Sequence, residues 1–277
     1  MYISLNSTLT ANRVPWPEFA RLAVRTGYLG VDVNLGKAIE LGLDSTRALL
    51  ADTRLKPAIV GLPVEYKKEA SDFQRDLPKL DDAARFATAI GCPRLGTWIM
   101  SSSVLPKAEQ RKIYLDRLGP VCEVLAKHQA RLAIEFLGPV HLRKANPHEF
   151  IYRMDEMLAF AKEIGPNAGL MLDSWHWHHA EGTSKDILSA GKDRIVHVQV
   201  ADAQNLPPDQ IKDSERLMAG EGIIDFNAFF GALKTIGYTG GVSPEIFGRG
   251  LKDMPAEEGA KLGLKTTTQV MKKARVL

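Results

Sequence analysis

The sequence lacks the features that mark several large classes of protein. Among its 277 residues there are only two cysteines, Cys92 and Cys122, and their spacing is not CxxC. This argues against a disulfide framework, and we expect both thiols to be buried. Lys+Arg 36 against Asp+Glu 33 leaves a formal net charge of only +3, and no basic stripe is present. We therefore expect no nucleic-acid partner.

Long apolar segments are also missing. No uncharged run is long enough to cross a bilayer, and Met1–Asn6 contains no basic residue ahead of an apolar stretch. A secretory signal peptide would need a basic segment followed by an apolar stretch. The sequence therefore predicts a cytoplasmic protein that does not contact a membrane.

What the sequence does contain is a regular alternation of short apolar runs and longer amphipathic segments. The expected strands are residues 2–6, 31–33, 57–60, 95–99, 132–136, 169–173, 194–200 and 242–246. The expected helices are residues 15–26, 45–54, 73–90, 107–129 with a kink at Pro120, 147–164, 184–190, 226–236 and 256–276. Eight such units of about 35 residues favour α/β architecture, as a single (β/α)8 TIM barrel in which residues 1–277 form one domain.

Three of the expected strands end in an acidic residue. Glu135, Asp173 and Glu245 each close an apolar run, and Gln199 lies near the end of the strand between the last two. Side chains alternate along a strand, so the apolar neighbours place all four residues on the inner face. In a TIM barrel the carboxyl ends of the strands open onto one face, where active sites form. The four side chains should therefore meet there.

Clustered acids need a positive charge between them. Three carboxylates in contact cannot all be ionised unless a cation neutralises them. The alternative is that each acid pairs with a neighbouring arginine or lysine, which is the usual situation for a single acid. An all-oxygen set favours Mg²⁺ or Mn²⁺, with Zn²⁺ or Co²⁺ as other possibilities. We therefore predict a divalent metal ion bound by Glu135, Asp173, Gln199 and Glu245.

Further polar and aromatic residues lie where they can reach the same face. His176 and His178 follow the Asp173 strand, and Arg216 lies in the long loop of residues 201–222. Long loops in compact domains are usually functional. We predict that these three residues bind substrate and that Trp98, at the end of the fourth strand, lines the pocket. His197 is expected to support Gln199 from below.

These segments resemble the xylose-isomerase-like barrel superfamily, and within it the inosose (2-keto-myo-inositol) isomerase group. The similarity is densest in residues 133–138, 169–178 and 202–245. The resemblance implies that Glu135, Asp173 and Glu245 bind a divalent metal, and that His176 and Arg216 bind substrate. The family has a histidine where Gln199 stands, although hydroxypyruvate isomerases are similar in having glutamine. Pro244 also departs from the pattern, and we expect a distortion beside Glu245.

The residues suit proton transfer next to a carbonyl group. Glu135 and Glu245 would remove and return a proton of a ketose, inosose or related hydroxy-carbonyl compound, through an enediolate stabilised by the metal. The predicted activity is that of a sugar isomerase or epimerase, in a possible homo-oligomer. A dehydratase or lyase would share the first step. A non-catalytic sugar-binding barrel is a further alternative, whereas a DNA-repair nuclease would need more histidines and a basic groove.

Overall fold

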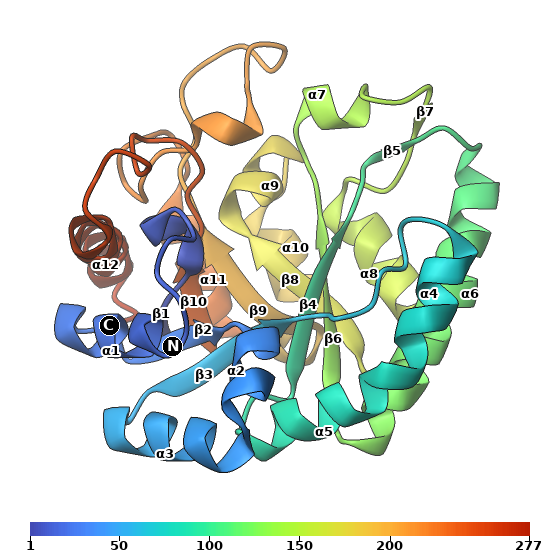
Figure 1. Cartoon of the computed structure of the whole chain (residues 1–277). Helices are drawn as coiled ribbons and strands as arrows, with labels where there is room; N and C mark the ends of the chain where they lie inside the picture. Colours follow the sequence, from blue (N-terminus) through green and yellow to red (C-terminus); the bar gives the residue numbers. More distant parts are fainter.

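The computed structural model describes residues 1–277 and contains a closed barrel of eight parallel strands (Figure 1). The strands are β1 (Tyr2–Leu5), β2 (Gly30–Val33), β3 (Lys56–Gly61), β4 (Arg94–Ile99), β6 (Arg131–Phe136), β8 (Ala168–Asp173), β9 (Ile195–Val200) and β10 (Gly241–Pro244). Neighbours in the barrel follow one another along the chain, and β10 pairs with β1 to close it. The prediction of an eight-stranded α/β barrel is confirmed.

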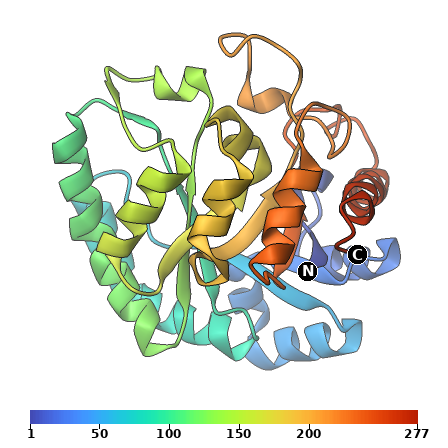
Figure 2. The same cartoon turned by 180° about the vertical axis from the view of Figure 1, so that it is seen from behind.

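Helices surround the barrel, as Figures 1 and 2 show from opposite sides. They are α1 (Glu18–Thr26), α2 (Leu35–Leu41), α3 (Leu43–Thr53), α4 (Ala70–Asp76), α5 (Leu80–Ala89), α6 (Lys107–Lys127), α7 (Val140–Arg143), α8 (Met154–Ile164), α9 (Ser174–His179), α10 (Ser184–Ala190), α11 (Phe226–Thr235) and α12 (Ala256–Lys273). A small antiparallel pair, β5 (Ser102–Ser103) and β7 (His148–Glu149), lies with α7 at the end where the strands finish, uppermost in Figure 1.

Two of the expected helices differ from the observed ones, and one observed helix was not expected. The helix predicted over residues 73–90 is divided, because Pro78 lies in a short 3-10 turn between α4 and α5. The helix predicted over residues 147–164 begins only at Met154, because β7 occupies the segment before it. Helix α2 was not expected at all, although the side chain of Asn34 caps its first turn. In contrast, α6 continues through Pro120 as one helix, as predicted.

The core has an outer and an inner layer. Most buried apolar side chains lie between the strands and the helices, and this layer includes both cysteines. Inside the barrel, a small cluster of Ile59, Ala133, Met171 and Val196 fills the space below the open end. The pairing of β8 with β9 shifts by one residue at Val196, a β-bulge. Bulges commonly occur next to active sites, where they redirect side chains.

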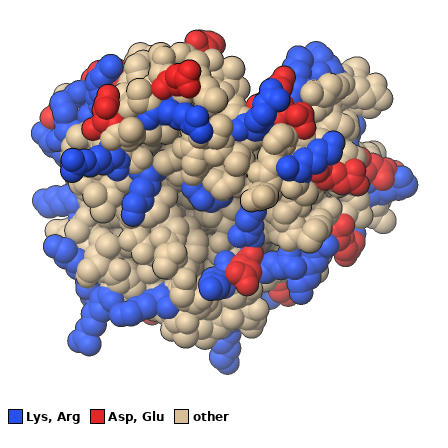
Figure 3. Space-filling model, turned by 90° about the horizontal axis from the view of Figure 1, so that it is seen from below, with Lys and Arg blue, Asp and Glu red and all other residues tan.

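The surface adds two observations. None of the helices combines the length and the apolar character needed to span a bilayer. On the face drawn in Figure 3, lysine and arginine side chains are distributed around the edge, and uncharged surface occupies most of the centre.

Candidate active site

The four predicted ligand residues lie at or near the carboxyl ends of neighbouring strands. Glu135 is on β6 and Asp173 ends β8, where it pairs in register with Gln199 on β9. Ser243 of β10 pairs with Gln199 on its other side, and Glu245 follows two residues later. Because the strands are adjacent and parallel, this register brings the side chains together at the open end.

Pro244 does not distort the strand as expected. The pairing of β10 with β9 continues in register through Pro244 and Val200. The next residue, Glu245, donates its backbone N–H to the carbonyl oxygen of Val200 at 3.0 Å. Pro244 is the last residue of the strand, and the hydrogen bonding to β9 continues beyond it. The expectation of a distortion was therefore wrong, and Glu245 is held by the regular ladder.

Arg216 lies among the acids. Its Nη1 atom is 2.8 Å from Asp173 Oδ2 and 3.2 Å from Glu245 Oε2, and its Nη2 atom is 2.7 Å from Asp213 Oδ1. The side chain is only 2% exposed. Its guanidinium group stacks over the rings of Trp175 and Phe247, with centroid distances of 4.8 and 4.6 Å. Arginine is suited to such buried, stacked positions.

One guanidinium group does not balance these acids. Burial, and then the negative charges of Glu245 and Asp173, raise the pKa of Glu135 well above its usual value. Burial also raises the pKa of Glu245, to about 7, although Arg216 opposes the shift. The pKa of Asp173 is raised by burial against the same opposing charge. The cluster therefore has an excess of negative charge that protons or another cation must neutralise.

His176 belongs to the same cluster. It is the third residue of α9, the helix that directly follows β8, and is 1% exposed. Its Nε2 atom is 3.0 Å from Arg216 Nη2 and 3.8 Å from Glu135 Oε1. Burial, and then the charge of Arg216, lower its pKa well below the usual value, so the ring is neutral. Glu135, Asp173 and His176 can place one ligand atom each within 4.8 Å of one another.

Two oxygens of the cluster have no hydrogen-bond partner. They are Glu135 Oε1 and Gln199 Oε1, and both are buried. The amide group of Gln199 donates from Nε2 to Glu245 Oε1 at 2.9 Å, which leaves the carbonyl oxygen free. Buried polar atoms without partners are rare in folded proteins. Pairing with basic residues, the alternative noted above, accounts for Asp173 and Glu245 but leaves Glu135 without a basic partner. The donor set fits a hard divalent cation.

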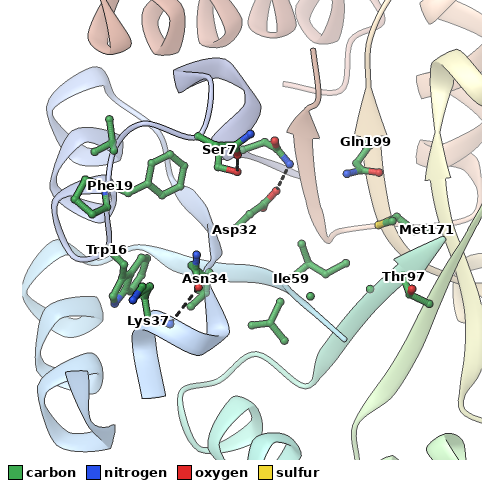
Figure 4. Close-up of a pocket in the computed structure, with 18 of the residues that line it drawn as sticks. Ser7, Trp16, Phe19, Asp32, Asn34, Lys37, Ile59, Thr97, Met171 and Gln199 are labelled. Carbon is green, nitrogen blue, oxygen red and sulfur yellow. Dashed lines mark hydrogen bonds between the residues drawn. The ribbon is translucent and has the colours of Figure 1, made fainter. Parts of the chain in front are cut away.

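A cavity of about 500 Å³ adjoins the cluster (Figure 4). Gln199 and Met171 form one wall, and residues from the β1 to β4 side form the rest. Trp98, which pairs in register with Glu135, lines it and is 41% exposed, in agreement with the predicted wall. Asp32 also lines this cavity, although it was not among the site residues expected from the sequence. Its position between Val31 and Val33 in a short strand was the available signal.

Two other predicted residues lie elsewhere. His178 lines a different cavity, beside Val140 and Arg143, so we do not include it in the proposed site. His197 was expected to support Gln199, but its Nε2 atom lies 2.9 Å from the hydroxyl of Ser243 instead. Burial lowers the pKa of His197 to about 3, so the ring is neutral.

The loop that contains Arg216 is held by Asp202. The carboxylate of Asp202 accepts backbone N–H groups of Ala203, Gly220, Gly222 and Ile224 at 2.8–2.9 Å. Its backbone pairs in both directions with Leu217, the neighbour of Arg216. A Cβ atom on Gly222 would lie 2.1 Å from the carbonyl oxygen of Ala203, so only glycine fits. The Gly220–Gly222 segment thus has a structural role.

We predict that Asp202→Ala lowers the free energy of unfolding by about 3 kcal/mol or more, because four backbone N–H groups, those of Ala203 and Ile224 buried, lose their acceptor. Activity should fall as well, since Arg216 loses its support. Denaturant unfolding and hydrogen exchange at the Gly220 and Gly222 amides measure the two effects on structure. Asp209→Ala, an exposed position of the same loop, is the matched control. Equal stability of the two variants would contradict the assigned role.

Comparison with known proteins gives the family. The model of the xylose isomerase-like TIM barrel family matches residues 20–270. The chain belongs to this family. Among solved structures, a xylose isomerase domain protein from Alicyclobacillus acidocaldarius superimposes with a TM-score of 0.91 at 26% identity, covering 99% of both chains. The resemblance noted in the sequence is therefore confirmed for the family and for the fold.

Several named relatives are similar over part of their length. The inosose isomerase of Bacillus subtilis is 26% identical over 176 residues, which are 63% of this chain and 61% of that protein. The putative hydroxypyruvate isomerase of Homo sapiens is 28% identical over 62% of this chain and 60% of that protein. A 3-dehydroshikimate dehydratase of Pseudomonas putida is 32% identical over 40% of this chain and 18% of its own length. The match to the Bacillus subtilis inosose isomerase thus spans less than two thirds of that protein. The relatives are thus chiefly sugar-type isomerases, the class expected from the sequence.

Proposed function

We propose that this family member is a divalent-metal-dependent isomerase or epimerase of a ketose, inosose or related hydroxy-carbonyl compound. The observation that carries the proposal is the cluster of Glu135, Asp173 and Gln199, which are buried, with Glu245, which is 17% exposed, at the ends of consecutive strands. Arg216 and His176 lie in contact with it, and a cavity adjoins it. Related proteins named as isomerases support the same class.

The cluster can hold a divalent ion with its own oxygens. Glu135, Asp173, Gln199 and Glu245 would be the ligands, because two of their oxygens have no partner in the protein. His176 lies within reach of the same position. When bound, the ion supplies Lewis-acid polarisation of the substrate carbonyl group and neutralises part of the negative charge. Oxygen ligands favour Mg²⁺ or Mn²⁺.

Glu135 and Glu245 would transfer the proton. A general acid or base works best when its pKa lies near the working pH, and both glutamates have raised pKa values. One of them removes the proton from the carbon beside the carbonyl, which gives an enediolate. The other returns a proton to the neighbouring carbon in an isomerase, or to the opposite face of the same carbon in an epimerase.

Arg216 and His176 would orient the substrate oxygens. The guanidinium group is held by Asp213, Asp173 and Glu245 and by two aromatic rings, so its position and charge are fixed before substrate binds. Preorganised donors of this kind stabilise charge that develops in the transition state. The neutral ring of His176 contacts Arg216 and lies near Glu135, so it can share in the same task.

Proton exchange with solvent tests the proposal. A panel of ketoses, inososes and hydroxypyruvate is incubated with the metal-loaded protein in deuterated water, and NMR detects which compound gains deuterium. We expect uptake at the carbon next to a carbonyl in at least one compound, with formation of an isomer or epimer. Loss of water from the labelled compound would identify a dehydratase instead. Bound metal without deuterium uptake in any compound would favour a sugar-binding barrel.

A further inference from the structure

The cavity beside the acid cluster contains an acidic side chain that the proposed proton transfer does not use. Asp32, on β2, lines the cavity together with Gln199. Figure 4 shows Asp32 between the wall with Trp16 and Phe19 and the wall with Gln199 and Met171. A substrate whose reacting carbons lay beside Gln199 would extend through the cavity towards Asp32.

The protein holds Asp32 as an acceptor. The hydroxyl groups of Ser4 and Ser243 each donate to Oδ1 at 2.8 Å. The amide of Asn6 donates to Oδ2 at 2.9 Å. The side-chain amide of Asn6 cannot flip without breaking two hydrogen bonds, because its Oδ1 atom accepts the backbone N–H and the hydroxyl of Thr8 at 2.9 and 2.7 Å. A carboxylate offers about four acceptor positions, so one remains on Oδ2 beside the cavity.

No cation neutralises Asp32. All three of its partners are uncharged side chains. The two basic residues that line the cavity do not contact Asp32. Lys37 pairs with Glu40 at 2.7 Å, and the guanidinium group of Arg13 donates to backbone carbonyl oxygens of Thr10, Leu251 and Met254. A phosphate or carboxylate group at this end would therefore meet a carboxylate without a counterion, which is unfavourable.

We propose that Asp32 determines specificity by accepting a hydrogen bond from a hydroxyl group at the far end of the substrate, so that the cavity selects uncharged polyhydroxylated compounds. Aromatic side chains and amides in the same wall, including Trp16 and Asn34, suit the apolar faces and hydroxyl edges of such a compound. This inference deepens the proposed function and rests on it for the position of the reacting carbons.

The test compares two substrates that differ at that end. An inosose has hydroxyl groups beyond its reacting carbons, whereas hydroxypyruvate has only a carboxylate there. In Asp32→Asn, kcat/KM for the inosose should fall about 10- to 100-fold, as expected for loss of a charged acceptor. The value for hydroxypyruvate should stay the same or rise, because the substitution removes a negative charge that disfavours its carboxylate. Asp52→Asn, at an exposed position of α3, is the matched control and should change neither. Equal losses for both substrates, or no loss for the inosose, would overturn the proposal.

Binding separates this inference from the proposed function. If neither compound is turned over, the reaction assignment fails, but the cavity can still be tested with myo-inositol as the probe. Trp16 and Trp98 line the cavity, so their fluorescence should report binding. Affinity should fall about tenfold or more in Asp32→Asn. Unchanged affinity, or no binding to the wild-type protein, would overturn the role of Asp32.

A wild-type comparison covers the case in which Asp32→Asn does not fold. myo-Inositol and myo-inositol monophosphate differ only in the charged group. The wild-type protein should bind the uncharged compound about tenfold or more tightly, because the phosphate would face an unneutralised carboxylate. Equal or tighter binding of the phosphate would overturn the proposal.

Discussion

Glu135→Gln should lower kcat about 10²- to 10⁴-fold, the usual contribution of a positioned general acid or base. Glutamine keeps the size and the polar oxygen of the side chain but cannot exchange a proton. Steady-state rates and deuterium uptake by the substrate measure the loss. Both should fall together, because the substituted group acts at the proton-transfer step itself.

The fold should survive this substitution. Glu135 is 5% exposed and has no lysine or arginine partner, and His176 beside it is neutral, so its charge is costly to bury and its removal should cost less than about 1 kcal/mol of stability. Thermal unfolding and circular dichroism check this point. Glu123→Gln, on the exposed face of α6, is the matched control and should retain full activity. Full activity in Glu135→Gln would contradict the assigned role.

The barrel could be predicted because its units are locally encoded. Apolar runs of strand length alternate with amphipathic helices. The alternation of side chains along each strand predicted that Glu135, Asp173 and Gln199 lie on the inner face, without information on which strands are adjacent in the barrel. The expected helix boundaries failed where a single residue or a small tertiary element decides the local structure. Pro78 divides one helix, and the pairing of β7 with β5 removes the first turns of another.

Parts of the site depend on contacts between distant segments. The position of Arg216 within hydrogen-bond distance of Asp173 and Glu245 follows from the loop that Asp202 holds, and no periodicity encodes that distance. His178 was included because it is close in sequence to His176. The two residues nevertheless line different spaces, because α9 turns the second ring away. Asp32 was missed because its strand has only four residues and ends in no acid.

Removal of divalent metal should abolish the activity and lower the thermal stability, while the barrel stays folded. An ion that binds only the folded chain at 100 times its dissociation constant adds about 2.7 kcal/mol of stability. Chelation removes this contribution. Arg216 still pairs with Asp173 and Glu245 in its absence, so the cluster keeps one positive charge. Calorimetry with and without a chelator, together with metal analysis, measures the effect on stability.

Re-addition of single ions then tests the ligand set. Mn²⁺ or Mg²⁺ should restore activity best, because each proposed ligand atom is a carboxylate or amide oxygen. In Gln199→His, an imidazole nitrogen replaces the amide oxygen, and the preference should move towards Zn²⁺ or Co²⁺ because imidazole suits these ions. An ion preference that is the same in both proteins would show that Gln199 is not a ligand. Full activity after complete chelation would show that the reaction does not use the ion. The excess negative charge around Glu135 would then have to be neutralised by protons alone.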